Sequence, residues 1–487
     1  MNTPIRRLSV LIAALFGALL VASTIIQFAQ AQSLNVMAAN KRTLLDNYSR
    51  ERGSILVGGQ AIAKSVPVDD QFAWLRTYPE GRLYSQITGF YGYSVGNPFG
   101  LENAADDLLS GKADQLFVRR VTDLLTGRDT VGATIELTLN AKAQKVASEG
   151  LGKNRGAVVA LDPRTGAILA MVSHPQYDPN PLSSHDLAKS EAAWKKLSND
   201  KAKPFINRAI TGDLYPPGSV FKVVTAAAAL EQGLVADENS EVPGPAELDL
   251  PLTETNLPNE DRRACGPGNK TTLIHALEIS CNTAFGSLGL ELGGEQLRAQ
   301  AAKFGFGDSI QIPMRVAPST MPAEINAPQA AQSAIGQYEV RTTPLQMAMI
   351  AGAIANQGRV MTPYLIQSIR TADLDVIESA PDPEELSQAV SARTADILKK
   401  MMVSVVDNGS GRRAQIPGVA VGGKTGTAQH DLKKNPHAWF ISFAPADDPQ
   451  VAVAVVVEES GVTGNEVGGA RVAAPIAKDV MEAVINR

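Results

Sequence analysis

The sequence lacks a surplus of charge of either sign. Its 45 lysines and arginines stand against 50 aspartates and glutamates, which gives a formal net charge of -5, and no long block of one sign interrupts the mixture. A nucleic-acid-binding domain usually carries a basic surplus on one face, so we expect no nucleic-acid partner. Internal repeats and low-complexity tracts are absent as well. The 44% of hydrophobic residues is ordinary for a globular protein with a sizeable core.

One long uncharged run lies near the N-terminus, from Leu8 to Phe28. Arg6 and Arg7 precede it, and the next basic residue is Lys41. A bilayer-spanning helix needs about 20 apolar residues. The positive charge on the N-terminal side predicts a cytoplasmic N-terminus, with the rest of the chain outside the cell membrane.

The alternative for this run is a cleaved signal peptide. Ala29-Gln30-Ala31 has the small-x-small form of a cleavage site. Signal peptides, however, have apolar regions of only about 7–15 residues, so the length favours an uncleaved single-pass anchor. Both interpretations place the working part of the chain outside the cytoplasm.

The remaining sequence predicts an α+β protein with a small mixed pedestal domain and a larger domain with an antiparallel sheet flanked by helices. We expect a tail and anchor over 1–32, a pedestal over 33–150, and the larger domain over 151–487. Strands are expected at 156–161, 167–172, 421–428, 438–443 and 451–457, and helices at 141–151, 344–355 and 474–485. The polar segments 178–207, 238–270 and 373–385 have the composition of loops and connectors.

A candidate nucleophile follows the turn Tyr215-Pro216-Pro217-Gly218. Ser219 begins an alanine-rich apolar helix, and Lys222 lies three residues later on the same helix face. A serine hydroxyl is a weak nucleophile until a base takes its proton, so an amine beside it is a functional arrangement. Ser-x-x-Lys alone also occurs by chance in many helices.

Two further motifs follow in order. Ser280 and Asn282 interrupt a helical pattern, and Lys424-Thr425-Gly426-Thr427 lies in a predicted strand. Alone, Ser280 and Asn282 could be local helix breakers, and the lysine could protect a sheet edge. The three motifs together are the signature of serine acyltransferases that react with penicillin.

The chain resembles the class B penicillin-binding proteins, which are monofunctional transpeptidases, and within them the actinobacterial penicillin-binding protein A group. The similarity extends over nearly the whole length. It includes the anchor, Arg52-Gly53, Gly100-Leu101-Glu102, Asn207-Arg208-Ala209, Thr343-Pro344-Leu345-Gln346 and Ala438-Trp439-Phe440. Arg52 and Glu102 by themselves are surface or ion-pair residues. The sequence Ile335-Gly336-Gln337-Tyr338 departs from the Ile-Gly-Gln-Gly of many relatives. Whether this loop contributes to substrate binding therefore stays open.

The resemblance implies D,D-transpeptidation of peptidoglycan stem peptides, inhibited by β-lactams. Ser219 would form the acyl-enzyme and Lys222 would be its base, because the nearby cation Lys424 favours a neutral amine. Ser280 would pass a proton to the leaving amine, and Asn282 would hold the substrate amide. Thr425 and Thr427 would bind the terminal carboxylate, with Gly426 allowing close approach of the peptide, and the N–H groups of Ser219 and Thr427 would form the oxyanion hole.

Neither a metal nor an organic cofactor is needed for this reaction. The expected partners are nascent glycan and its lipid-linked precursor, the membrane, a membrane-embedded glycan polymerase, and proteins of division or elongation. The N-terminal region is too short for a glycosyltransferase module and has no paired carboxylates.

Three other functions share the motifs. A β-lactamase needs a carboxylate that positions water, and Glu324-Ile325-Asn326 has the wrong spacing for it. A D,D-carboxypeptidase would use water in place of the second amine and stays open. A non-catalytic penicillin-binding sensor or scaffold would not need intact motifs.

Cysteine is scarce, and the two that occur are Cys265 and Cys281. Both lie outside the membrane, where a disulfide is permitted, and the segment holding Cys265 leads directly into the helix holding Cys281. We therefore expect a disulfide, which requires Cα atoms within about 7 Å. The alternative is two free thiols, with Cys281 packed as a small apolar residue.

Overall fold

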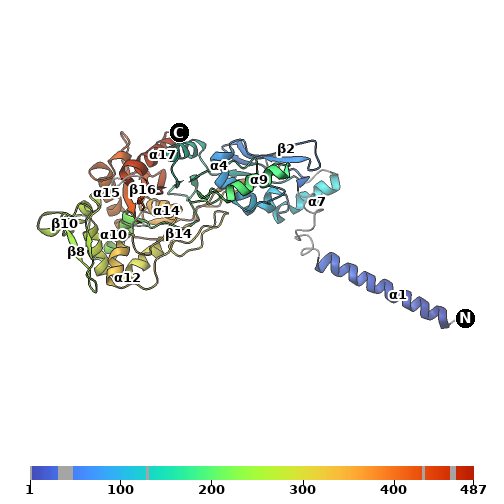
Figure 1. Cartoon of the computed structure of the whole chain (residues 1–487), viewed down its shortest axis with the longest axis horizontal. Coiled ribbons are helices and arrows are strands. Elements are labelled where there is room, and N and C mark those ends of the chain that lie inside the picture. Colours follow the sequence, from blue (N-terminus) through green and yellow to red (C-terminus); the bar gives the residue numbers. More distant parts are fainter. Residues whose placement is uncertain are drawn as a thin grey trace.

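The computed structural model describes residues 3–30, 48–127, 131–373, 375–429, 434–460 and 468–486. The molecule has a long N-terminal helix that projects from an elongated body (Figure 1). This helix consists of α1 (Thr3–Thr24) and a π-helical end η1 (Ile25–Ala29). Its segment Pro4–Phe28 has a mean hydropathy of 2.5 and packs against nothing in the described parts of the chain. Such a helix fits a membrane anchor or a signal sequence. Ala31 and residues 33–47 lie outside the described residues.

The pedestal is built on a six-stranded sheet of order β13-β12-β4-β1-β2-β3. Its strands are β1 (Ile55–Val57), β2 (Gln60–Pro67), β3 (Trp74–Thr77), β4 (Thr134–Leu137), β12 (Ile366–Arg370) and β13 (Val376–Ser379). Gly58 and Gly59 join β1 to β2 with φ values of 56° and 76°, as a two-residue type I′ turn requires. Strands β12 and β13 come from a much later segment of the chain, and β12 pairs antiparallel with β4.

The short helices of this part of the molecule are α4 (Gly81–Thr88), α5 (Gly100–Ala104), α6 (Asp106–Leu109), η2 (Asp114–Leu116), α7 (Phe117–Thr126) and α9 (Leu187–Ser198). Of these, α4 packs against β2 and α6 packs against β4. A buried charge cluster lies beneath them. Glu102 is fully buried, and its two oxygens accept hydrogen bonds of 2.6 Å from the Nε atoms of Arg52 and Arg76. Burial alone would raise the pKa of Glu102, but the two guanidinium groups hold it below its ordinary value. Arg52 and Glu102 are therefore an internal ion pair and not surface residues.

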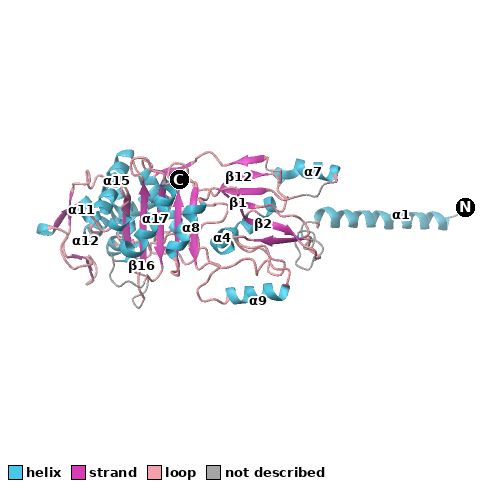
Figure 2. Ribbon diagram, turned by 90° about the horizontal axis from the view of Figure 1, so that it is seen from above, coloured by secondary structure: helices cyan, strands magenta, loops and turns pink. Residues whose placement is uncertain are grey.

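The catalytic domain has a five-stranded antiparallel sheet of order β15-β16-β17-β5-β6. Its strands are β5 (Gly156–Leu161), β6 (Ile168–His174), β15 (Gly422–Ala428), β16 (His437–Ala444) and β17 (Val451–Val457). Helix α14 (Pro344–Ala355) packs on one face, and α8 (Ala141–Leu151) and α17 (Ala474–Ile485) pack on the other. The expected α+β fold is confirmed, and Figure 2 shows both sheets with their helices.

Successive residues of the central strands face different cores. Val159 belongs to the core beneath α14, whereas Val158 and Ala160 belong to the core of α8 and α17. Both faces of the sheet are therefore covered, which explains the nearly continuous apolar runs of its strands. Strand β15 is at the edge of the sheet.

A helical layer lies on the side of the sheet where α14 packs. It contains η3 (Gly218–Phe221), α10 (Lys222–Glu231), α11 (Leu273–Glu278), α12 (Asn282–Lys303), α13 (Ala327–Ala334) and α15 (Ala392–Asp407). Small elements complete the domain: β7 (Glu241–Pro243), β8 (Glu247–Asp249), β9 (Asn256–Pro258), η4 (Pro267–Asn269), β10 (Lys270–Thr272), β11 (Arg359–Met361), β14 (Glu385–Gln388), η5 (Arg412–Ala414) and η6 (Gly469–Ala473).

The three segments expected as loops contain regular structure. Helix α9 lies within 178–207, strands β7 to β9 lie within 238–270, and β13 lies within 373–385. Helix α9 buries little beyond Ser190, so it lacks a wide apolar stripe. The short strands have mostly exposed residues, so their pairing depends on partners that local sequence does not reveal.

The expected domain division at residue 150 remains a prediction. Helix α8 crosses this position and contributes Ala143, Ala147 and Leu151 to the core of the five-stranded sheet. The segments that build the two domains thus interleave along the chain.

Candidate active site

The candidate nucleophile lies in a tight turn pressed against the edge strand. Ser219 is in the 3₁₀ turn η3, which continues directly into α10. Gly218 has a φ of 57°, and a Cβ there would come within 2.2 Å of the Thr427 carbonyl oxygen. A Cβ at Gly336 would come within 2.1 Å of the Gly218 carbonyl oxygen. Only glycine therefore lets β15 and the 335–338 loop hold the turn from both sides.

The residues before the nucleophile are braced by the sheet and the 335–343 segment. Tyr215 exchanges two backbone hydrogen bonds with Thr342, of 3.0 and 2.8 Å. The Trp439 Nε1 donates to the Pro216 carbonyl at 3.1 Å. The Tyr215 hydroxyl donates to Glu458 Oε1 at 2.7 Å, which also accepts from Arg208 Nε at 2.7 Å. Burial opposes ionisation of Glu458, yet Arg208 and the Tyr215 hydrogen bond keep its pKa below the ordinary value. The turn is thus fixed on several sides.

Two buried lysines converge on one hydroxyl. Lys222 and Lys424 are fully buried. Lys222 Nζ donates to the Ser280 carbonyl (2.6 Å), to Ser280 Oγ (3.1 Å) and to Asn282 Oδ1 (2.7 Å). Lys424 Nζ donates to Ser280 Oγ (2.9 Å) and to the Thr425 carbonyl (2.8 Å). A buried amine needs such partners. Ser280 Oγ lies between two nitrogens, so it can exchange a proton with either.

Ser280 is held in an unusual backbone conformation between two helices. It follows α11, has a φ of 57°, and precedes Cys281, whose sulfur accepts from the Ala284 N–H as the N-cap of α12. A non-glycine residue at positive φ is uncommon and is often found at functional sites. The conformation turns the Ser280 side chain toward the two lysines.

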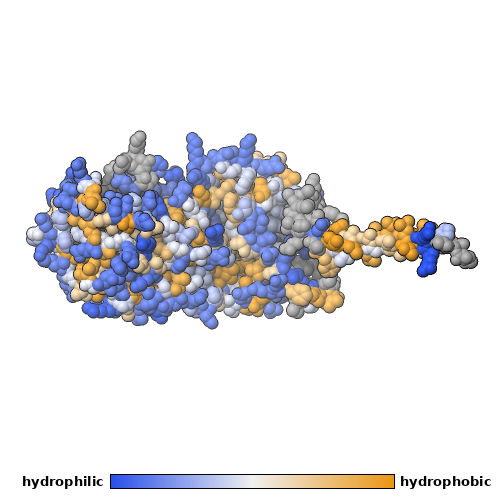
Figure 3. Space-filling view, turned by 90° about the horizontal axis from the view of Figure 1, so that it is seen from below, coloured by the Kyte–Doolittle hydropathy of each residue, from blue (hydrophilic) through white to orange (hydrophobic). Residues whose placement is uncertain are grey.

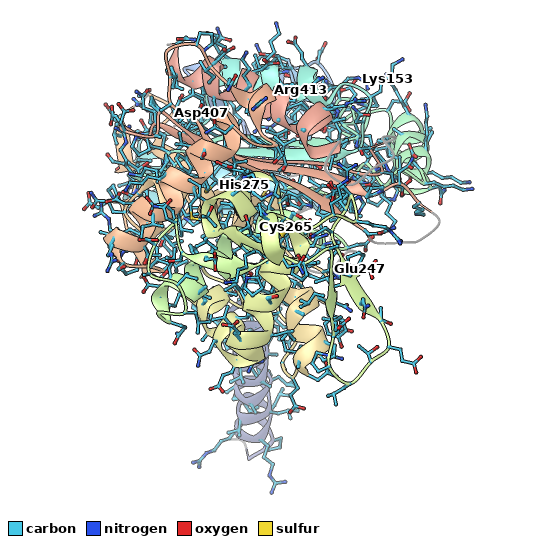
Figure 4. The ribbon with its side chains drawn as sticks, turned by 90° about the vertical axis from the view of Figure 1, so that its left-hand side faces the viewer. Lys153, Glu247, Cys265, His275, Asp407 and Arg413 are labelled. Atoms are coloured by element: carbon cyan, nitrogen blue, oxygen red, sulfur yellow. A yellow bond between two sulfur atoms is a disulfide. The ribbon has the colours of Figure 1, made fainter. Side chains whose placement is uncertain are left out.

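A disulfide links this turn to the segment that contains Asn259 and Cys265. Cys265 and Cys281 are bonded, with their Cα atoms 6.1 Å apart. Asn259, in the same segment, accepts a hydrogen bond from the Thr283 N–H (3.0 Å) and donates to the carbonyls of Pro245 and Arg263 (2.8 Å each). Figure 4 views this side of the molecule, with Cys265 beside the helical layer and Glu247 on the β8–β9 hairpin. The segment with Asn259 and Cys265 is therefore attached covalently to the residue next to Ser280.

Strand β15 supplies the remaining expected residues in two different environments. Thr427 lines the cleft, and its Oγ1 is buried without a hydrogen-bond partner in the described chain. Thr425 is fully buried, and its Oγ1 lies 2.7 Å from Ser410 Oγ. A Cβ on Gly426 would meet Val220 Cγ1 at 2.8 Å. Gly426 is thus required for packing of the nucleophile turn, a contact within the protein that the sequence-based role did not include.

The residues surround a cleft of about 420 Å³. Its lining includes Ser219, Asn282 and Thr427, together with Asn259, Arg262 and residues of the β8–β9 hairpin. Gln337 also lines the cleft, so the loop that departs from the pattern of many relatives does border the site. Such a cleft beside a sheet edge suits an extended peptide that adds a strand to β15.

Other expected positions lie elsewhere. Glu324 is exposed, and Asn326 caps α13 in a capping box with Gln329. Within the described ranges no group of His, Cys, Asp or Glu has the geometry of a metal site. Sequence reasoning missed Ser410 and Asn259, because both lie in Gly-, Pro- and Asn-rich segments that predict a turn and reveal no partner.

Comparisons with known proteins agree with this geometry. Residues 156–482 match the penicillin binding protein transpeptidase domain, and residues 52–135 match the penicillin binding protein A dimerisation domain. The peptidoglycan D,D-transpeptidase PbpA of Mycolicibacterium smegmatis is 44% identical, over 100% of this chain and 99% of the relative. PbpA of Mycobacterium tuberculosis is 41% identical, over 100% of this chain and 99% of the relative.

A solved structure gives the same result. Penicillin-binding protein A of M. tuberculosis, as its ceftriaxone acyl-enzyme complex, superposes with a TM-score of 0.86 at 40% identity, covering 91% of this chain and 100% of that one. The imipenem acyl-enzyme complex of the same protein has a TM-score of 0.85 at 40% identity, with the same coverage. The chain therefore belongs to the class B penicillin-binding protein transpeptidases, as a homologue of penicillin-binding protein A.

Proposed function

We propose that the protein is a serine D,D-transpeptidase that cross-links peptidoglycan stem peptides and is acylated by β-lactams on Ser219. The observation that carries the proposal is the position of Ser280 Oγ, which accepts hydrogen bonds from both Lys222 and Lys424 beside the cleft. A proton taken from the nucleophile can be returned to a leaving group through this hydroxyl. Membership of the family and the acyl-enzyme complexes of a 40% identical relative support the same reaction.

The acylation step uses Ser219, Lys222, Ser280 and the backbone N–H of Thr427. Lys222 accepts the Ser219 proton as Ser219 Oγ attacks the carbonyl carbon between the two terminal D-alanines. The N–H groups of Ser219 and Thr427 bind the oxyanion, at about 3–4 kcal/mol per donor. As the carbon–nitrogen bond breaks, Ser280 gives its proton to the departing D-alanine and regains one from the lysine side.

Substrate binding follows from the cleft walls. The peptide extends along β15, with its terminal carboxylate near Thr427, whose buried hydroxyl has no partner in the described chain. Asn282 holds the substrate amide by exchanging its present bond to the Pro258 carbonyl. The amine of a second stem peptide then attacks the ester, forms the cross-link and frees Ser219.

We expect a long-lived acyl-enzyme. Among the described cleft-lining residues Glu260 is the one carboxylate, and it is exposed. Without a positioned base, hydrolysis is slow. This favours transpeptidation over the β-lactamase function, and a carboxypeptidase remains the alternative that the assay below tests.

We place the enzyme in the cell membrane, with α1 as an uncleaved single-pass anchor, the N-terminus in the cytoplasm and the cleft outside. The two arginines at the N-terminal end of this helix support this orientation. Because the chain has no glycosyltransferase module, a membrane-embedded polymerase supplies the glycan, in division or in elongation.

Intact mass spectrometry tests the nucleophile. Wild-type protein incubated with penicillin should gain one adduct that persists for many minutes, and Ser219→Ala should gain none. Ser287→Ala, a buried helical serine outside the cleft, should label like wild type. Labelling of Ser219→Ala would refute the assignment. Rapid return to the free mass with consumption of the drug would indicate a β-lactamase.

A turnover assay with a thioester donor and added D-amino acids tests the acceptor. Transfer of the acyl group to the D-amino acid should exceed its release to water. Release to water alone would establish a carboxypeptidase, and acylation without turnover would indicate a sensor or scaffold.

A further inference from the structure

Helix α7 carries an apolar stripe that no part of the described chain covers. Phe117, Val121 and Leu125 are 59%, 40% and 81% exposed. Their spacing of four residues places them on one side of the helix. Large apolar side chains exposed in a row usually mark an interaction surface. Val376, on the adjacent strand β13, is also exposed (53%).

The base of α7 is fixed to the pedestal while this stripe points away. Leu116, just before the helix, packs with Ala133 and Ile369 in a small core. Gln115 Nε2 donates to Glu378 Oε2 of β13 at 3.0 Å. The Arg120 guanidinium donates to the carbonyls of Gly111 (3.2 Å) and Ala113 (2.9 Å). The exposed stripe is therefore presented by a supported helix.

The stripe lies at the end of the body from which the N-terminal helix projects. Figures 1 and 2 both place α7 beside that end, and Figure 3 shows apolar surface there. The chain from Gln30 to Tyr48 can span at most about 60 Å, which keeps this end of the body close to the anchor.

We propose that α7 lies in the outer membrane surface as an interfacial helix, with Phe117, Val121 and Leu125 inserted among the lipids. The inference rests on α1 being the anchor given above. A convex helix with three protruding side chains suits a fluid lipid surface, which needs no preformed groove.

Site-specific fluorescence on the full-length protein tests the proposal. The two native cysteines are bonded to each other and the described chain has no free thiol, so one added cysteine can carry an environment-sensitive dye. Leu125→Cys is labelled and reconstituted in vesicles of phosphatidylcholine and phosphatidylglycerol containing a lipid-attached quencher. Thr122→Cys, exposed on another side of α7, and Leu252→Cys, 87% exposed between β8 and β9, are the matched controls.

Quenching at position 125 should be at least about threefold stronger than at positions 122 and 252, with Val121→Cys intermediate or similar to 125. Equal quenching at 125 and 252 would overturn the proposal. Protection of position 125 only after addition of a membrane-embedded polymerase would also overturn it, in favour of a protein partner.

Two measurements on the same samples separate this inference from the proposed function. Failure of the protein to float with the vesicles would remove the anchor and overturn the inference, whereas labelling of Ser219 by fluorescent penicillin would still support the transpeptidase. Flotation without penicillin labelling would refute the transpeptidase and leave the quenching result to decide on α7.

Discussion

The hydroxyl oxygens of Ser410 and Thr425 lie 2.7 Å apart, although the residues are 15 positions apart in sequence. The Ser410 N–H also donates to the Glu278 carbonyl at 3.0 Å, two residues before Ser280. One short loop therefore connects the end of α11, two residues before Ser280, to strand β15. It fixes the rotamer of Thr425, the threonine that shares a strand face with Thr427.

Ser410→Ala should slow acylation by penicillin about tenfold, because loss of one hydrogen bond of roughly 1–1.5 kcal/mol frees the Thr425 hydroxyl to rotate. Stopped-flow labelling with fluorescent penicillin gives the rate. Ser410→Thr keeps the hydroxyl and should retain most of the rate. Equal rates for the alanine variant and wild type would show that this contact does not position the site.

Replacing Cys265 and Cys281 together by alanine should lower the free energy of unfolding by roughly 3 kcal/mol in the chain-entropy account. The bridge is beside Ser280, so we also expect acylation to slow severalfold while the far-ultraviolet circular dichroism at 25 °C stays unchanged. Urea unfolding and penicillin labelling measure the two effects. A stability loss with a wild-type acylation rate would restrict the disulfide to a structural role.

Gly426→Ala should cost roughly 1–3 kcal/mol of stability and reduce the acylation rate, because the added Cβ would lie 2.8 Å from Val220 Cγ1 and displace the nucleophile turn. The double variant with Val220→Ala removes that methyl group and should recover part of both losses. Additive losses in this double-mutant cycle would show that the two residues do not interact.

Glu102→Gln should destabilise the pedestal by roughly 3–5 kcal/mol at pH 7, because Arg52 and Arg76 lose their buried counter-charge. The pKa of Glu102 is lowered in the folded protein, so its contribution is complete above the unfolded value of about 4.3 and is lost as pH falls toward the folded value. The difference from wild type in urea unfolding should therefore shrink below pH 4. Glu247→Gln, at an exposed residue, should have no effect at either pH. A difference that is independent of pH would contradict the charged state of Glu102.

The sequence alone predicts the elements that have strong local patterns. The helix expected at 141–151 is α8. The strands expected at 438–443 and 451–457 are nearly continuous apolar runs, and they form β16 and β17, which pair with each other. The strand expected at 421–428 is β15, which pairs with β16. Ser219, Lys222 and Ser280 could be singled out because their motifs are short and linear.

Contacts between distant segments could not be predicted in this way. The pairing of β12 with β4 joins residues far apart in sequence, and the residues of neither strand indicate which strand will be its partner. The same holds for Ser410, whose role depends on a partner that reaches it only through the folded sheet. The fixed position of Ser280 depends on a positive φ that its residue type does not favour.

The sheet that β4 and β12 share has a mechanical consequence. The chain leaves the pedestal after β4, builds most of the catalytic domain, and returns through β12 and β13. A single flexible linker is absent from the described part of this junction, and the Thr138 N–H and hydroxyl bond across it to the Leu365 and Ile168 carbonyls. The two sheets are therefore joined where the chain crosses from one to the other twice, through β4 and through β12. A swing of one sheet against the other would have to break the hydrogen bonds of Thr138 at this junction, so the fold resists hinge motion there.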